Sequence, residues 1–159
     1  MFYIDLVVYY IGMRIMSLNN KIRAISLWQP WAGGIALGIK QIETRSWPTK
    51  VRGDVVICSA KKKVDAGFYP LNYLAVHSYF EDDKDLLELK GYALCIVEIF
   101  DCIQIDDSNK MAGTEYLWGD YTDGRYAWMT RNLRLIEPTP IKGGQGFFYL
   151  DRNVIKDIK

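Results

Sequence analysis

The chain has 159 residues, of which half are hydrophobic and a quarter are charged. This length suffices for one domain with its own core and is too short to expect two, and the composition excludes a largely disordered protein. The formal net charge of +1 excludes a polybasic nucleic-acid coat, so an anionic partner has to be met by a local patch.

The first 16 residues are apolar, but Asp5 and Arg14 interrupt them. The stretch is shorter than the roughly 20 apolar residues of a membrane span, and it lacks the basic start and cleavage site of a signal peptide. We therefore expect an N-terminal extension at residues 1–19, one domain at residues 20–159, and no membrane partner. The alternatives are an added strand or a weak membrane or partner contact.

The next segments predict a strand, a short helix and a second strand. Residues 23–28 form a strand-like run, after which Pro30 can occupy the first position of a helix. The helix continues over residues 31–37, and Gly38 is suited to end it. Residues 41–47 alternate in polarity, which predicts a strand.

The rest of the chain continues with strands and short helices. Residues 54–60 are apolar and β-branched, which indicates a buried strand, and residues 61–79 predict a helix that Pro70 interrupts. Further helical segments are predicted at residues 82–90 and 111–118, and further strands at residues 92–105, 125–136 and 147–150. We also expect a bend near Arg131 and Asn132 and a glycine-rich loop at residues 142–146.

This order of elements favours one fold class. Strands with short helices between them, and no regular βαβ alternation, argue against a doubly wound parallel sheet. We expect an α+β domain built on a small, mostly antiparallel β-barrel with helices inserted in its loops. Basic residues gather at 40–63 and 125–152 and acidic ones at 81–90 and 101–123, so a nearly neutral chain can present one basic face to phosphate.

The cysteines and the histidine limit other kinds of chemistry. Cys58, Cys95 and Cys102 form no C-x-x-C pair and are odd in number, which indicates a reducing compartment, and we expect a cytoplasmic protein. The single His77 excludes a site built from several histidines, and a structural zinc site needs four close ligands. We therefore expect neither a metal nor another cofactor.

The candidate site lies at residues 38–47. Strand alternation places Glu43, Arg45 and Trp47 on one face, with Lys40 in the connection before them. Such a lysine can act as base or nucleophile and a neighbouring carboxylate can carry a proton. An arginine fork binds phosphate, and an indole gives a base a surface for stacking. The alternative is an ordinary ion pair beside a packed indole.

Flanking aromatic residues extend this candidate site. Trp28 and Trp31 flank Gln29 at the corner between the first strand and the first helix, where indoles can line a cleft and the amide can contact a base edge. Tyr126 and Trp128 lie two positions apart, hence on one face of a later strand. The alternative for all of them is a role in the core.

Five segments, in order, resemble the ASCH domain family, named for activating signal cointegrator homology. They are S-L-W-Q-P-W-A, G-I-K-Q-I-E-T-R-S-W, R-G-D-V-V-I, G-R-Y-A-W and P-I-K-G-G-Q-G-F-F. The family's hallmark G-x-K-x-x-E-x-R stands at Gly38, Lys40, Glu43 and Arg45. The resemblance covers roughly residues 22–151, and an ordered series of motifs is more specific than one short match.

The resemblance implies a PUA-like β-barrel with a cleft lined by the hallmark, and a function related to RNA. Some bacterial members are ribonucleases, and others are amidohydrolases that deacylate N4-acetylcytidine. In the amidohydrolases a catalytic lysine precedes a nucleophilic threonine by three positions. Lys40 fits this pattern and Glu43 departs from it. That branch also uses a later glutamate, for which Glu98 and Glu115 are candidates, and Cys58 stands where many members carry a histidine.

Three functions remain open from the sequence. The first is binding of RNA or a nucleoside through Lys40, Arg45 and the tryptophans. The second is a small hydrolase of RNA or of an N-acylated cytidine, with Lys40 as base, Glu43 as proton carrier and Arg45 as anion clamp. The third is a protein-interaction domain that docks through its apolar N-terminal stretch. The oligomeric state is not predicted.

Overall fold

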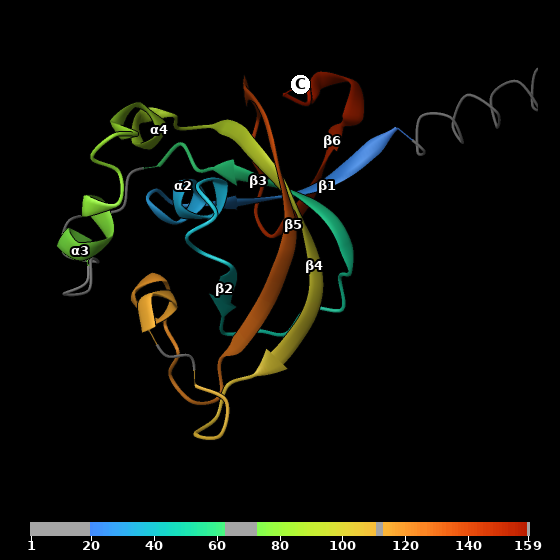
Figure 1. Cartoon of the computed structure of the whole chain (residues 1–159). Coiled ribbons are helices and arrows are strands. Elements are labelled where there is room, and N and C mark those ends of the chain that lie inside the picture. The colour runs from blue at the N-terminus through green and yellow to red at the C-terminus, as the bar shows by residue number, and fades with distance from the viewer. Residues whose placement is uncertain (1–19, 63–72, 111–112, 159) are drawn as a thin grey trace, which may run out of the picture.

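Six strands form one curled sheet in the order β2-β5-β4-β3-β1-β6. The computed structural model describes residues 20–62, 73–110 and 113–158 (Figure 1). The strands are β1 (Lys21–Leu27), β2 (Ile42–Arg45), β3 (Gly53–Ser59), β4 (Tyr92–Gln104), β5 (Tyr126–Pro140) and β6 (Phe147–Asp151). β1 and β3 pair in parallel, and every other neighbouring pair in this sheet is antiparallel. The predicted α+β class is confirmed, with a mostly antiparallel sheet that curls into a half-barrel.

Short helices lie on one side of this sheet (Figure 1). They are α2 (Trp31–Ala36), α3 (Tyr73–Ser78), α4 (Lys84–Glu88) and the 3₁₀ helix η2 (Gly113–Trp118), with a further 3₁₀ turn η3 (Arg152–Val154) after β6. Because α2 and β2 separate β1 from β3, the chain has room for the crossover that parallel pairing requires. None of the helices among the described residues is long and apolar enough to cross a membrane.

Two parts of the sequence analysis fall on residues outside the described ranges. The predicted helix over residues 61–79 is described only in part, and its described helical portion is α3. The expected N-terminal extension at residues 1–19 lies wholly outside them, so its boundary stays a prediction.

The long strands β4 and β5 curl the sheet. Their pairing shifts register at three places, and Asn132 has a φ of 54° opposite one of them. This confirms the bend predicted near Arg131 and Asn132. Extra residues in one strand increase local twist and bend it, so β5 pairs with β2 along its first residues and bends away beyond them.

Each face of the sheet buries its own apolar cluster, because neighbouring strand residues point to opposite faces. On β3, Val55 and Ile57 join the cluster on the face covered by α2, which we call the α2 face. Val56 and Cys58 join the cluster on the opposite face. Burial raises the pKa of the Cys58 thiol to about 12, which fits a small hydrophobic residue in a core and not a reactive group.

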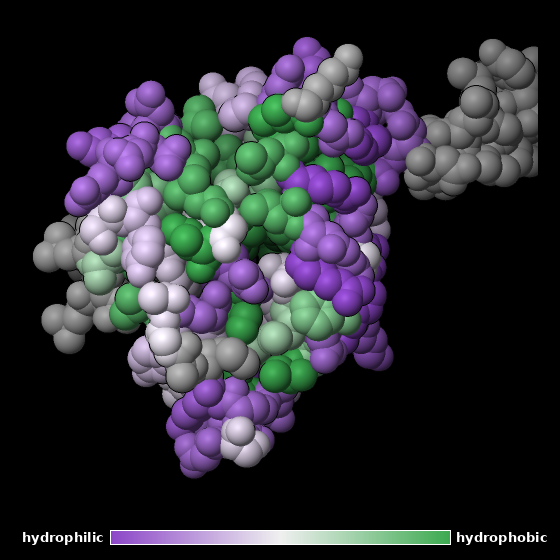
Figure 2. All heavy atoms as spheres, viewed as in Figure 1, coloured by the Kyte–Doolittle hydropathy of each residue, from purple (hydrophilic) through white to green (hydrophobic). Residues whose placement is uncertain are grey.

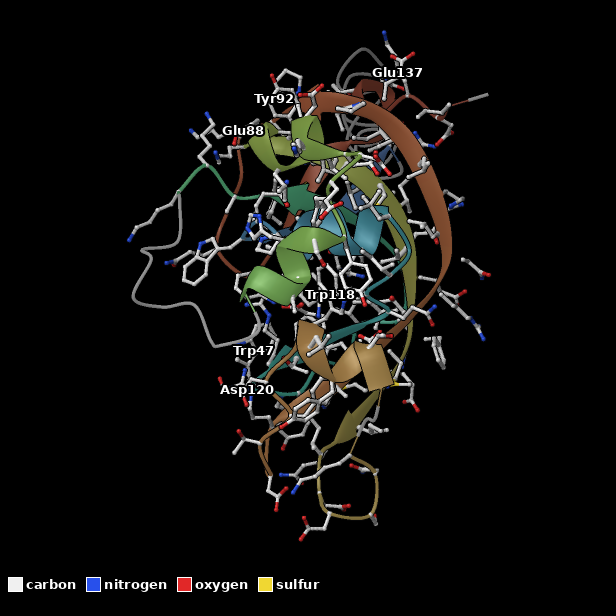
Figure 3. All side chains as sticks on the ribbon, turned by 60° about the vertical axis from the view of Figure 1, so that its left-hand side comes forward. Trp47, Glu88, Tyr92, Trp118, Asp120 and Glu137 are labelled. Atoms are coloured by element: carbon white, nitrogen blue, oxygen red, sulfur yellow. The ribbon has the colours of Figure 1, made fainter. Side chains whose placement is uncertain are left out.

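Glycines let α2 approach the aromatic rings around it. A Cβ on Gly34 would lie 2.3 Å from Cζ3 of Trp118, and one on Gly33 would lie 2.8 Å from Cε1 of Phe80. Trp118 and Phe80 are almost fully buried in one cluster, and Trp118 is visible inside the molecule in Figure 3. The Trp118 ring thus sets the position of η2 beneath α2.

Candidate functional site

A tight turn connects α2 to the candidate site. Gly38 ends the helix with a φ of +75°, a conformation that glycine adopts without strain. The Gly34 carbonyl then accepts hydrogen bonds from the amides of Ile39 (3.1 Å) and Lys40 (3.0 Å). The glycine of the hallmark pattern therefore ends α2 and turns the chain so that Lys40 lies in the interior.

Lys40 lies in the interior, with a side chain that is 0% exposed. Its Nζ donates to the Ile42 carbonyl and, at 3.0 Å, to the Trp118 carbonyl. The same nitrogen lies 3.3 Å from Oε2 of Glu43. Since an ammonium group has three N–H donors, these three acceptors can satisfy all of them. In this arrangement Lys40 joins η2 to β2 and fixes Glu43.

Glu43 connects Lys40 to Arg45. Its second carboxylate oxygen, Oε1, lies 3.0 Å from Nε of Arg45, and its side chain is 15% exposed. This contact is an ion pair without hydrogen-bond alignment, since Nε of Arg45 is buried without a hydrogen-bond partner. The three residues form a row from the buried Lys40 to Arg45, whose side chain is 28% exposed.

Two indole rings lie near the guanidinium of Arg45, on the same side of it. Its Cζ lies 6.0 Å from the centre of the Trp47 ring and 5.9 Å from that of Trp128, within reach of a cation–π attraction. Trp128 is buried, whereas Trp47 is 39% exposed and lies at the periphery in Figure 3. The rings meet edge to face at 4.6 Å, and Nε1 of Trp128 donates to the Trp47 carbonyl at 3.3 Å.

Phe147, at the start of β6, extends the aromatic group. Its ring stacks on Trp128 with centroids 5.3 Å apart and planes 12° apart. The predicted site did not include this residue, although it directly follows the glycine-rich loop at residues 142–146. The strand spacing of Tyr126 and Trp128 pointed to this face, but the ring from β6 that covers Trp128 could not be identified from spacing along one strand.

Glu115, on η2, is the later carboxylate near the hallmark residues. Its oxygens accept hydrogen bonds from the backbone amides of Gln41 (3.0 Å) and Ile42 (2.9 Å), and from the Tyr121 hydroxyl at 3.3 Å. These bonds hold the chain where β2 begins. Together with the bond from Lys40 to the Trp118 carbonyl, they join η2 to the candidate site at two points.

Glu98 belongs to a different environment. It forms a two-pronged ion pair with Arg131, at 2.7 and 3.0 Å, and accepts from Asn132 at 2.6 Å. The hydrogen bond from Arg131 lowers the pKa of the Glu98 carboxyl below its usual range. Its register partner on β3 is Asp54, the residue before Val55, so it projects on the side opposite the α2 face.

The strand-to-helix corner divides the remaining predicted residues. Gln29 donates to the carbonyls of Leu86 (2.8 Å) and Leu89 (3.3 Å) and accepts from the Gly33 amide, so its amide ties α2 to α4. Trp31 packs against the cluster around Trp118. Trp28, which directly follows β1, is 39% exposed. Their predicted contact with a base stays a prediction.

Tyr126 lies directly opposite Arg45 in the pairing of β2 with β5, and it is partly buried against the cluster of the α2 face. The structure therefore brings together Lys40, Glu43, Arg45, Trp47, Tyr126 and Trp128. No group of three or more histidine, cysteine or carboxylate side chains suited to a metal occurs within the described ranges.

Hydrophobic side chains gather on part of the molecular surface near these elements. Figure 2 shows them over the upper centre of the face where Figure 1 draws α2 and the ends of β1 and β3, with hydrophilic residues around them.

Comparisons with known proteins agree with this fold. The family model described as the ASCH domain matches residues 25–141. A crystal structure of ASCH from Zymomonas mobilis superposes with a TM-score of 0.50 and 17% identity, over 83% of this chain and 89% of that one. A tyrosine-to-phenylalanine mutant of that protein gives 0.48 and 15% over 83% and 91%, and a serine-to-alanine mutant 0.46 and 15% over 85% and 92%. No curated protein sequence matches significantly.

Proposed function

Because the chain belongs to the ASCH domain family, we propose that it binds RNA or a nucleoside through Arg45 and Trp47. The observation that carries the proposal is the state of Arg45. Its guanidinium lies beside Glu43 and close to two indoles, and no described group is hydrogen bonded to its terminal nitrogens. Those nitrogens can form the two parallel hydrogen bonds that suit a phosphate or the edge of a base.

Trp47 supplies the second half of the interaction. Its indole is partly exposed beside the guanidinium, so a base can stack on it while its phosphate or polar edge meets Arg45. The contact from Trp128 holds the indole in place, which limits the side-chain entropy lost on binding. An ordinary structural ion pair does not require an exposed indole at this position.

Lys40 and Glu43 act in this proposal as positioning residues. The ammonium group of Lys40 is enclosed and has three acceptors, so a ligand at Trp47 does not meet it directly. Its effect reaches the ligand through Glu43, which it holds at the distance that orients Arg45. The hydrolase function, with Lys40 as base and Glu43 as proton carrier, stays a prediction that turnover can test.

Fluorescence anisotropy with a labelled, mixed-sequence single-stranded RNA tests the binding. Arg45→Ala is expected to weaken binding about tenfold, because a charge-assisted pair of hydrogen bonds is lost. Trp47→Ala is expected to weaken it at least about fivefold through lost stacking. Arg134→Ala is the matched control, because Arg134 pairs with Asp54 on the opposite face and should leave binding unchanged. Equal affinities for all four proteins would overturn the proposal.

A parallel assay separates binding from hydrolysis. The protein is incubated with N4-acetylcytidine and with the RNA, and products are followed by chromatography. The proposal expects intact substrates, together with RNA binding that weakens as salt rises. Turnover that disappears in the Lys40→Ala variant, with the fold retained, would instead establish the hydrolase and the catalytic role of Lys40.

A further inference from the structure

One arginine differs from the others in the described part of the chain. Arg23, on β1, has no carboxylate of a described residue within 4.0 Å. The remaining described arginines each pair with an acidic side chain: Arg45 with Glu43, Arg52 with Asp101, Arg125 with Asp120, Arg131 with Glu98, Arg134 with Asp54 and Arg152 with Asp157. The Arg23 cation is thus oriented without being neutralised.

Aromatic groups provide that orientation. Arg23 donates from Nη2 to the Tyr149 hydroxyl at 3.0 Å, and its Cζ lies 5.5 Å from the centre of the Tyr149 ring and 6.0 Å from that of Phe147. A guanidinium carries five N–H donors, so one bond to a hydroxyl leaves most of them available to an anion. Tyr149 is 57% exposed, which makes the adjoining surface accessible.

These residues continue the candidate site along the same face. Arg45 reaches the Trp128 ring at 5.9 Å, Trp128 reaches Phe147 at 5.3 Å, and Phe147 reaches Arg23 at 6.0 Å. The two guanidinium carbons are therefore separated by at most about 17 Å, the length of these three steps laid end to end. A continuous series of aromatic contacts thus connects two oriented arginines.

We propose that Arg23 and Tyr149 form a second subsite, which binds a backbone phosphate of a single-stranded oligonucleotide whose neighbouring base lies at Trp47. This inference rests on the proposed function and extends it from one base to a strand. Alternating aromatic surfaces and cations are how proteins follow a single strand, because each nucleotide offers a π-face and a phosphate. A free nucleoside, which lacks the phosphate, would leave Arg23 unused.

Two acidic residues lie on the strands next to Arg23. Asp151 is the nearby acidic residue on β6, in register with Lys21, and its Oδ1 accepts from Asn20 and Asn153, both at 2.9 Å. Asp54 precedes Val55, the β3 partner of Arg23, but its side chain pairs with Arg134 on the opposite face. Neither carboxylate forms an ion pair with Arg23.

The test measures binding of an RNA tetramer at several salt concentrations to wild type, Arg23→Gln and Arg134→Ala. Arg23→Gln keeps most of the side chain's length, and its unfolding midpoint checks the fold. We expect about tenfold weaker binding at low salt, and a slope of log K against log salt that is smaller by about 0.7, the value for one phosphate contact on a single strand. Arg134→Ala is expected to match wild type.

A chemical variant of the ligand locates the contact. Tetramers with one neutral methylphosphonate linkage each are compared on wild type and Arg23→Gln. The subsite is supported if one neutral linkage weakens binding to wild type while the same linkage does not change binding to Arg23→Gln. Equal affinity and slope for the two proteins overturns it. Arg45→Ala is measured with the same tetramers. If only Arg45→Ala weakens binding, the subsite is refuted and the proposed function stands. If Arg45→Ala does not weaken binding, the proposed function is refuted.

Discussion

Replacing Lys40 by methionine should destabilise the protein substantially. Methionine is unbranched and apolar and can fill the same space, so the change removes the charge and the donors with little change in packing. It leaves the carbonyls of Ile42 and Trp118 without this donor and removes the buried cation beside Glu43.

The expected cost follows from burial. Removing one partner of a buried ion pair costs about 3 to 5 kcal/mol. Glu43 is 15% exposed and keeps Arg45 at 3.0 Å, so the lower value, about 3 kcal/mol, applies here. For a chain of this length each kcal/mol lowers the unfolding midpoint by roughly 3 °C, so the shift should be about 10 °C.

Thermal unfolding followed by circular dichroism measures this shift, and urea titration gives the free energy of unfolding. Lys62→Met is the matched control, because Lys62 is exposed and its loss should change stability by less than about 0.5 kcal/mol. The double variant of Lys40→Met with Glu43→Gln should cost less than the sum of the single changes, since each removes the same pair. A shift below about 3 °C, with additive single and double changes, would refute the reasoning.

Three further outcomes are expected. Gly34→Ala should lower stability by about 1 to 3 kcal/mol in urea titration, because its Cβ would collide with the Trp118 ring; an unchanged midpoint would show that η2 moves freely. Alkylation of the native protein at pH 8 should modify Cys102 and spare the other two cysteines, whose pKa burial raises to about 12; equal labelling by mass spectrometry would contradict this. Burial lowers the pKa of His77, so the unfolded chain binds the proton first as pH falls below about 6.5, and the midpoint should drop between pH 7.5 and 5.5 in wild type and less in His77→Gln.

Local patterns predicted the strands and turns because their causes are local. The apolar β-branched run became β3, Gly38 ended α2 with a positive φ, and the bend near Asn132 lies where the pairing of β4 and β5 shifts. The hallmark spacing likewise placed Glu43 and Arg45 close together on β2. These features depend on residues a few positions apart, which a pattern along the chain contains.

The surroundings of the site depend on residues far apart in the chain, so the sequence did not specify them. Lys40 is enclosed because a backbone carbonyl 78 positions away, that of Trp118, lies against it. Gln29 bonds to carbonyls of residues 86 and 89, which no property of its own neighbourhood indicates. The unpaired state of Arg23 is likewise a property of all the described carboxylates together and not of its strand.

The hallmark residues Gly38, Lys40, Glu43 and Arg45 have two kinds of role, one in the fold and one in contact with a ligand. Gly38 turns the chain and Lys40 bonds to η2, both within the fold, whereas Arg45 ends the row with its terminal nitrogens available. Arg45→Ala should therefore weaken RNA binding about tenfold while changing stability by less than about 1 kcal/mol, as partly exposed ion pairs contribute little. Lys40→Met should instead lower stability by about 3 kcal/mol. At a temperature where this variant stays folded, it should weaken RNA binding less than Arg45→Ala does, because Glu43 still lies beside Arg45. If Lys40→Met abolished binding in its folded state while stability hardly changed, Lys40 would itself contact the ligand.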